Sequence, residues 1–261
     1  MNETAATPPA TNSDKTNPPA PLAVSVVLPI YNEESCIAAV IDELAAVLDA
    51  RFPGRHEIVA VDDGSTDATP RLLREARTRL GPRLRVLRLV PNSGQSAAFC
   101  AGFHAARGAA VVTMDADGQN DPADIPRVVA ALEGADCCCG YRATRRDRWS
   151  RRIASRLANA VRNRALGEEI IDTGCSLKAF RAEIARRMQP WDGLHRFFAS
   201  FVLMQGGHVC QVAVNHRPRA GGRSKYTNWK RLRKTVRDLR GVRWLKSRAR
   251  PCRVETEAPA G

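Results

Sequence analysis

Residues 24–48 read VSVVLPIYNEESCIAAVIDELAAVL, and the change of pattern within this segment decides the fold class. Its first part, residues 24–28, is a β-branched apolar run ended by Pro29, which is typical of a buried strand. From residue 33 onward, apolar side chains recur at the three- and four-residue spacing of a helix. The segment is therefore predicted to be a strand followed by a helix.

The same alternation continues downstream. Apolar strand-like runs fall at residues 58–61, 84–90, 109–114 and 136–140, and helical patterns fall between them at residues 67–80, 98–106 and 125–132. Strands that are apolar throughout indicate a parallel sheet covered on both faces by helices. We therefore predict an α/β fold with a mostly parallel sheet, in which the three consecutive cysteines Cys137, Cys138 and Cys139 are small apolar filler in a strand.

The second half of the chain has a different character. We expect a basic helix at 151–166, a strand at 175–180, a helix at 194–205 and a strand at 209–214. Residues 227–248 form an amphipathic basic pattern, which either packs on the domain or lies at a membrane surface with Trp229, Leu232, Val236 and Leu239 toward lipid. Residues 23–226 are expected to be one domain, between disordered tails at 1–22 and 249–261.

Charge is unevenly distributed along the 261 residues, whose net charge is +14. Residues 142–164 hold nine Arg and one acid, and residues 215–253 hold fifteen Lys or Arg and one acid, so the rest of the chain is mildly acidic. Nucleic acid, anionic lipid and phosphorylated substrates are all compatible with these two segments. Because the chain has no 18-residue apolar run, no secretory signal and no C-x-x-C pair, we expect a cytoplasmic protein, soluble or peripheral to a membrane, with reduced thiols.

Polar clusters follow three of the predicted strands: Asn32-Glu33, Asp62-Asp63 and Asp115-Ala116-Asp117. Ligands of open α/β sheets bind at the carboxyl ends of the strands, where these clusters are expected to meet. Two carboxylates one residue apart suit a hard divalent cation that also binds phosphate oxygens, although a turn or a helix cap has the same pattern. The chain has no P-loop, no G-x-G-x-x-G and no G-x-S-x-G motif, so neither nucleotide hydrolysis, dinucleotide binding nor α/β-hydrolase chemistry is supported.

Taken in order, the motifs resemble those of a family. Residues 29–33 (PIYNE), 61–67 (VDDGSTD) and 115–119 (DADGQ) look like those of the family 2 glycosyltransferases of GT-A fold, a Rossmann-like fold. Residues 172–181 (DTGCSLKAFR), 194–198 (LHRFF) and 219–226 (RAGGRSKY) are similar to segments of the dolichol- and polyprenyl-phosphate sugar transferases, such as the mannosyltransferases. The resemblance extends from about residue 24 to residue 246.

The resemblance implies roles for individual residues. Pro29, Tyr31, Glu33, Asp63, Asp115 and Ala116 would bind the nucleotide of a GDP- or UDP-sugar donor. Asp115, Asp117 and Gln119 would hold Mg²⁺ or Mn²⁺ on the donor diphosphate. Arg142, Arg152, Arg219, Ser224 and Lys225 would bind donor and acceptor phosphates, with Asp117, Arg219 and Lys225 as the catalytic residues.

The resemblance further implies transfer of a sugar, with mannose as the first expectation, to a polyprenyl or dolichyl phosphate at an anionic membrane surface. A lipid phosphate is ionised at neutral pH, so it needs no general base, and direct displacement with inversion is expected. One alternative is a soluble family 2 enzyme that acts on a saccharide or protein. A more remote alternative is a basic nucleic-acid-binding protein, but the basic segments have few interleaved aromatic residues and no nucleic-acid-binding motif, so no specific nucleic acid is expected.

Overall fold

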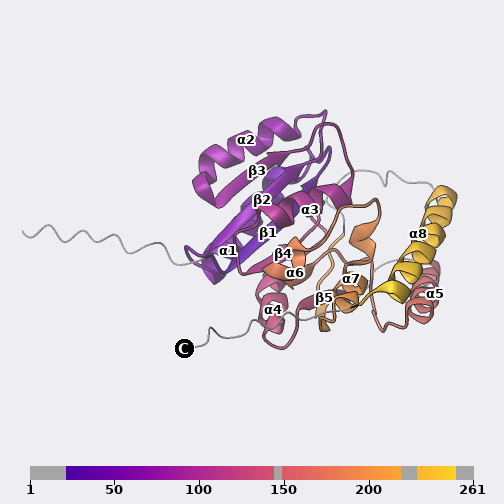
Figure 1. The fold of residues 1–261 in the computed structure, drawn as a ribbon. Helices are drawn as coiled ribbons and strands as arrows, with labels where there is room; N and C mark the ends of the chain where they lie inside the picture. Colours follow the sequence, from indigo (N-terminus) through magenta and orange to yellow (C-terminus); the bar gives the residue numbers. More distant parts are fainter. Residues whose placement is uncertain (1–21, 144–148, 219–227, 251–261) are drawn as a thin grey trace, which may run out of the picture.

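The computed structural model describes residues 22–143, 149–218 and 228–250 (Figure 1). The side chains of residues 149–156 and 228–234 are outside that description.

A seven-stranded sheet forms the centre of the described fold (Figure 1). Its strand order is β3-β2-β1-β4-β6-β5-β7. Adjacent strands pair in parallel except β6, which is antiparallel to both β4 and β5. The strands are β1 (Val24–Ile30), β2 (His56–Asp62), β3 (Leu84–Arg88), β4 (Ala110–Thr113), β5 (Cys137–Arg142), β6 (Lys178–Arg181) and β7 (Val209–Val214).

Helices connect these strands and cover both faces of the sheet, which confirms the predicted α/β class. They are α1 (Ile37–Arg51), α2 (Thr69–Leu80), α3 (Gln95–Ala105), α4 (Ile125–Ala130), α5 (Trp149–Leu166), α6 (Ala182–Arg186), α7 (Phe198–Met204) and α8 (Asn228–Arg248). The helix predicted at 194–205 is divided, because a 3-10 turn (Leu194–Arg196) precedes α7.

Two apolar cores lie on opposite faces of the sheet, because successive side chains of a strand point to opposite sides. In β1, Val26 and Leu28 pack with α1, α2 and α4, whereas Val27 packs with α3, α6 and α7. The second core contains a cluster of phenylalanine rings. The centroid of the Phe198 ring lies 5.4–5.6 Å from the ring centroids of Phe99, Phe103 and Phe180. Cys137, Cys138 and Cys139 are buried in β5 and are free thiols, as predicted.

The strand predicted at 175–180 begins later than expected, and it is antiparallel to its two neighbours, β4 and β5. β6 begins at Lys178, and Thr113 at the end of β4 pairs with Lys178 at the start of β6. The chain therefore enters β6 from the carboxyl end of β4, and the residues just before it lie at that edge of the sheet. Ser176 there donates a hydrogen bond to Asn120, which follows β4.

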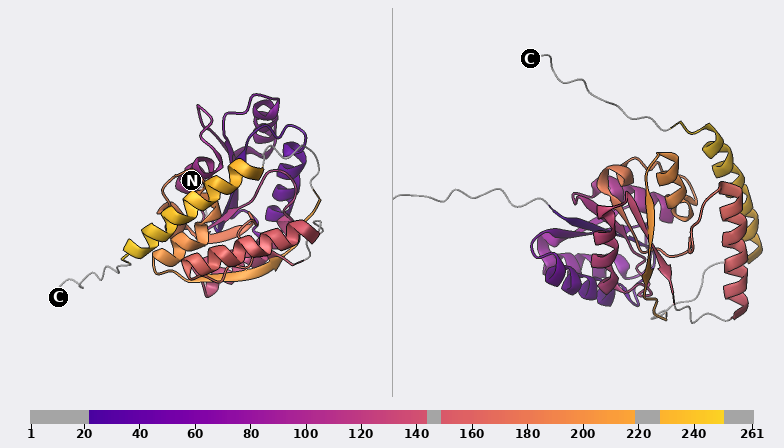
Figure 2. Two further views of the ribbon diagram at one scale, coloured as in Figure 1. Left: turned by 90° about the vertical axis from the view of Figure 1, so that its right-hand side faces the viewer. Right: turned by 90° about the horizontal axis from the view of Figure 1, so that it is seen from below.

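Helices α5 and α8 contact each other and form a layer at one end of the molecule, remote from α2 (Figures 1 and 2). A small third core of Leu166, Phe197 and Val242, with Leu239 packed against it, lies beneath this layer. Leu239 thus packs on the domain, as in one of the two predicted arrangements, and the other arrangement, which turns it toward lipid, is wrong at this residue. None of the helices in the described ranges is both long and apolar enough to cross a membrane.

Candidate active site

The carboxyl ends of β2, β1 and β4 lie side by side, since these strands pair in parallel. The chain order reverses between β1 and β4, because β2 and β3 follow on one side and β4 lies on the other. Such a switch point is where open α/β sheets bind ligands. The turns after these three strands carry all the residues predicted to bind the donor nucleotide except Pro29, which is the sixth residue of β1.

Hydrogen bonds between the turns after β1 and β2 shape the site. Asn32 adopts a left-handed conformation with a φ of 53°, which Asn tolerates better than most residues. Its backbone N–H donates to Ser65 Oγ at 3.0 Å, and its Oδ1 accepts from the backbone N–H of Thr66 at 2.8 Å. This arrangement fixes the turn that carries the exposed Tyr31 and the half-buried Glu33.

Asp115 and Asp117 lie on the turn that follows β4. Asp117 is largely buried, and its Oδ1 accepts from the backbone N–H of Gln119 at 3.1 Å. Asn120 Oδ1 accepts from the backbone N–H of Asp115 at 3.2 Å and from Ser176 Oγ at 2.8 Å. The segment that precedes β6 therefore holds the Asp115 turn in place without any ligand.

Gln95, the first residue of α3, belongs to this site although it is part of no predicted motif. Its Nε2 donates to Asp115 Oδ1 at 2.9 Å. The predicted helix began at residue 98, and the structure begins it at Gln95, directly after Gly94 with a φ of 88°. The glycine before the helical pattern was the signal that would have moved the helix start forward to Gln95.

Asp63 is buried and accepts several hydrogen bonds from the loop before α3. Its Oδ1 accepts from the backbone N–H of Ser93 at 2.7 Å, and its Oδ2 accepts from the N–H of Gly94 at 2.8 Å and from Asn92 Nδ2 at 3.0 Å. A carboxylate at the beginning of a helix is also favoured by the helix dipole. Asp63 therefore fixes the start of α3, and with it the position of Gln95.

Cys36 links the turn after β1 to the turn after β4. Its Sγ lies 3.3 Å from the carbonyl oxygen of Ala116 and 3.5 Å from Glu33 Oε2. Burial, together with the negative charge of Glu33, raises the pKa of Cys36 to about 11. Cys36 is therefore a neutral thiol that joins two donor-side turns rather than a nucleophile.

On the other side of the switch point, Arg142 is the last residue of β5 and forms a bidentate ion pair with Asp172. Its Nε and Nη2 donate to Asp172 Oδ2 at 2.7 Å and Oδ1 at 2.9 Å. A planar guanidinium suits such a fork, which fixes its orientation. Of the other residues predicted to bind phosphate, Arg219, Ser224 and Lys225 lie outside the described residues. Arg152 is part of α5, and its side chain is outside the description.

The segment after β7 approaches the Asp117 turn and brings a second unpredicted residue. His216 forms a bridge with Asn120, and its Nε2 lies 3.4 Å from Gln119 Nε2. Arg217 next to it donates from its backbone N–H to the carbonyl oxygen of Gln119 at 2.9 Å. No sequence motif links His216 to this turn, since the contact depends on β7 ending beside it.

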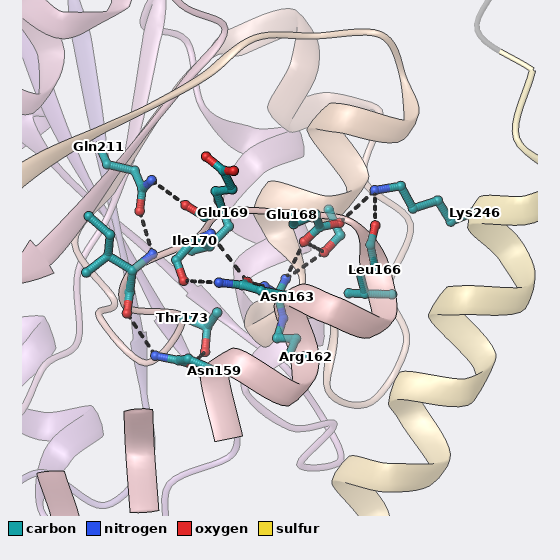
Figure 3. Close-up of polar contacts among 12 residues, drawn as sticks. Asn159, Arg162, Asn163, Leu166, Glu168, Glu169, Ile170, Thr173, Gln211 and Lys246 are labelled. Carbon is teal, nitrogen blue, oxygen red and sulfur yellow. Dashed lines mark hydrogen bonds and ion pairs between the residues drawn. The ribbon is translucent and has the colours of Figure 1, made fainter. Parts of the chain in front are cut away.

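A network of polar contacts holds the segment between α5 and β6 (Figure 3). Arg162 Nη2 lies 3.0 Å from Glu168 Oε2, and Lys246 Nζ from α8 lies 3.2 Å from Glu168 Oε1. Ser200 accepts from Arg162 and donates to Glu168. Asn163 bonds to both backbone groups of Ile170. This segment leads into Asp172 and Ser176, so the same loop joins α5 and α8 to the candidate site.

The oxygen atoms of the Asp115 turn fit a divalent cation. Asp115, Asp117 and Gln119 offer two carboxylates and an amide oxygen, the ligand types that Mg²⁺ and Mn²⁺ prefer. Within the described ranges, no group of three or more His, Cys, Asp or Glu side chains is placed to hold a metal by itself. A cation at this turn would therefore share its coordination with phosphate oxygens of a substrate, as Mg²⁺ usually does.

Comparison with known proteins identifies relatives. A model of glycosyl transferase family 2 matches residues 25–188. The chain is 39% identical over 236 residues to dodecaprenyl-phosphate galacturonate synthase of Rhizobium johnstonii, covering 88% of this chain and 69% of the relative. It is 39% identical over 204 residues to undecaprenyl-phosphate 4-deoxy-4-formamido-L-arabinose transferase of Edwardsiella ictaluri, covering 78% of this chain but only 62% of that relative.

A solved structure shows the same fold. Glucosyl-3-phosphoglycerate synthase of Mycobacterium tuberculosis, in complex with Mn²⁺, UDP and glucosyl-3-phosphoglycerate, matches with a TM-score of 0.65. The match covers 87% of this chain and 80% of that one, at 22% identity. Since the family model spans most of the chain and carries the Asp115 turn, the chain belongs to glycosyl transferase family 2, with a GT-A fold.

Proposed function

We propose that this chain transfers a sugar from a nucleotide-sugar donor to a polyprenyl phosphate at the cytoplasmic face of a membrane. The observation that carries the proposal is the turn of Asp115, Asp117 and Gln119 at the switch point, which lies next to the turns after β1 and β2. The two relatives, each named for a polyprenyl-phosphate acceptor, support the lipid part of the proposal.

The donor would lie across the ends of β1, β2 and β4. Pro29, Tyr31, Glu33, Asp63 and Ala116, together with Asp115, would bind the nucleotide. Asp115, Asp117 and Gln119 would hold a Mg²⁺ or Mn²⁺ ion on its diphosphate. A bound cation would neutralise the charge of the diphosphate. The structure further supports Asp63 as the residue that fixes the α3 start beside this donor site.

The acceptor phosphate would lie on the side of Arg142. Asp172 keeps the Arg142 guanidinium in one orientation, and Arg152, Arg219, Ser224 and Lys225 are the further candidates from the sequence. A phosphate oxygen of the acceptor attacks the anomeric carbon, the bond from that carbon to the diphosphate oxygen breaks, and the nucleoside diphosphate leaves with the electron pair. Because the attacking oxygen is already ionised, the proposal assigns no general base, and the sugar carbon is inverted.

The names of the relatives specify galacturonate and 4-deoxy-4-formamido-L-arabinose, so they give no support to the expectation of mannose. The donor panel of a test therefore includes UDP-linked uronic acids and pentoses beside UDP-glucose and GDP-mannose.

Transfer of radiolabelled sugar into an organic-extractable lipid tests the proposal. Purified protein is given Mg²⁺ or Mn²⁺, a polyprenyl phosphate in detergent and each donor in parallel. We expect label in the lipid phase, its loss in Asp117→Ala, and its retention in Asp42→Ala, which removes an exposed carboxylate from α1. Donor consumption that labels only water-soluble material would favour a soluble acceptor, and no consumption of any donor would contradict the proposal.

A further inference from the structure

Exposed apolar side chains are concentrated on the layer of α5 and α8. Leu157 and Val161 of α5 are 64% and 55% exposed, and Val236 and Trp244 of α8 are 42% and 63% exposed. With Leu245 of α8, which is 39% exposed, they make five large apolar side chains in two neighbouring helices. That is more than the scattered single residues that a protein surface ordinarily carries.

The four most exposed of these side chains lie in two helical rows, each of which also carries arginine. Leu157, Val161 and Arg164 recur at four- and three-residue steps along α5, and Val236, Arg240 and Trp244 recur at four-residue steps along α8. We call these six residues the outer face.

The opposite sides of both helices face the domain. Arg162 and Leu166 of α5 and Leu239 and Val242 of α8 pack inward. Since the two helices lie next to each other as one layer (Figure 2), their outward rows form one surface.

The outer face is positively charged, and neither helix offers it an acid among the side chains that the structure describes. The sequence of α5 contains no Asp or Glu, and the one acid of α8, Asp238, is directed inward and bonds to Arg196 at 3.0 Å. Arg237, Arg243 and Arg248 are exposed beside the row on α8. A solvated helix surface normally mixes both signs of charge, so this surface is complementary to an anionic partner.

Buried contacts fix both helices in place. Lys246 of α8 and Arg162 of α5 converge on the buried Glu168 (Figure 3), and Arg196 holds α8 through Asp238 and Thr235. The outer face is therefore a preformed surface, and α8 need not leave the domain to present it.

We propose that the outer face docks on the headgroup region of a bilayer that contains anionic lipids. Tryptophan and leucine beside arginine suit this region, because their apolar bodies enter the acyl boundary while guanidinium groups bind lipid phosphates. The inference rests on the proposed function in one respect, that a lipid acceptor requires the enzyme at a membrane. It differs from the arrangement predicted from sequence, because α5 takes part and Leu239 does not.

Vesicle co-sedimentation without substrates tests the surface. The vesicles are phosphatidylcholine alone or mixed with phosphatidylglycerol. We expect Leu157→Ser combined with Trp244→Ser to lower the partition coefficient at least about tenfold on mixed vesicles, since two inserting side chains are lost. Arg164→Gln combined with Arg240→Gln is expected to lower it about 25-fold on mixed vesicles, as each arginine near an anionic surface contributes about fivefold, and to change little on phosphatidylcholine.

Matched controls lie at the far end of the sheet. Val90→Ser removes an apolar side chain that is 81% exposed, and Arg74→Gln combined with Arg77→Gln removes two exposed charges from α2. These variants should bind within about twofold of the unmodified protein, whereas a fall equal to that of the outer-face variants would show general attraction of a basic protein and overturn the proposal. Unchanged vesicle binding in the outer-face variants would also overturn the proposal. A dimer that Trp244→Ser converts to monomer, with unaltered vesicle binding, would overturn it too, because the outer face would then be a contact between two copies of the chain.

Activity separates the two proposals. Outer-face variants should retain transfer to a detergent-dispersed polyprenyl phosphate and lose transfer to the same lipid in vesicles. If the unmodified protein binds vesicles but transfers to neither form, the proposed function fails while the docking surface stands.

Discussion

Gln95 Nε2 donates a 2.9 Å hydrogen bond to Asp115 Oδ1, and this contact joins the first turn of α3 to the turn that follows β4. Asp63 fixes the start of α3 by accepting from Ser93 and Gly94. Asp63, which was predicted to bind the nucleotide, and Asp115, which was predicted to bind the metal, are thus linked through Gln95.

Replacing Gln95 by Ala should weaken donor binding without unfolding the protein. The side chain is exposed, so its loss leaves the core intact, but Asp115 Oδ1 loses a hydrogen-bond donor that helps to orient the carboxylate. We expect the donor KM, measured at limiting Mg²⁺, to rise about fivefold, the equivalent of one hydrogen bond of about 1 kcal/mol, with an unchanged Tm. An unchanged KM and metal dependence would show that the Gln95 contact does not position Asp115.

Replacing Asp63 by Asn should destabilise the protein. An amide has one oxygen, so its NH₂ group would face a backbone N–H of Ser93 or Gly94 that the carboxylate now accepts. We expect the free energy of unfolding in urea to fall by about 1–3 kcal/mol. Asp42→Asn on α1 serves as the control. Full stability combined with a loss of donor affinity would instead assign Asp63 to the donor alone.

Breaking the buried ion pair of Arg162 and Glu168 should lower the free energy of unfolding by more than Asp63→Asn does. In Glu168→Leu, the Arg162 guanidinium remains buried without its carboxylate, which costs about 3–5 kcal/mol of unfolding free energy. Combining Arg162→Met with Glu168→Leu removes both charges and should recover a large part of that loss, since Lys246 is partly exposed and can turn toward water. A double variant as unstable as the single one would contradict the assignment of the loss to an uncompensated charge.

Much of the site followed from the sequence because it depends on local pattern. The apolar runs of β1, β2 and β4, and the polar residues after them, were enough to predict that these turns meet at one edge of the sheet. The antiparallel direction of β6, the contact of His216 with Gln119 and the pairing of Arg162 with Glu168 were not predicted. Each depends on how distant segments meet, and no spacing along the chain specifies that.

The helix at 227–248 shows the same limit. Its amphipathic pattern predicted α8 (Asn228–Arg248) almost to the residue, but the pattern alone left open which side packs on the domain. The structure turns Leu239 and Val242 inward because Phe197 and Leu166 offer them an apolar surface. Trp244 is thereby left outside, on the opposite side of the helix.

The buried cysteines should resist alkylation. Burial, with the charge of Glu33, raises the pKa of Cys36 to about 11, and burial raises the pKa of Cys100 to about 11. A raised thiol pKa means less thiolate at a given pH, about one part in a thousand at pH 8, and the thiolate is the reactive form. Iodoacetamide labelling read by mass spectrometry should spare both residues in the native protein and modify both in denaturant. Rapid native labelling of Cys36 would contradict its placement between Glu33 and Ala116.

The most direct test of the central claim is the identity of both products of transfer. With the active donor and a polyprenyl phosphate, the proposed displacement at the sugar carbon predicts nucleoside diphosphate in an amount equal to the sugar-lipid formed. NMR of that lipid should show inverted anomeric configuration, and Asp117→Ala should lose both products. Release of nucleoside monophosphate would place the attack at phosphorus, and a retained configuration would exclude a single displacement, so either result would contradict the account.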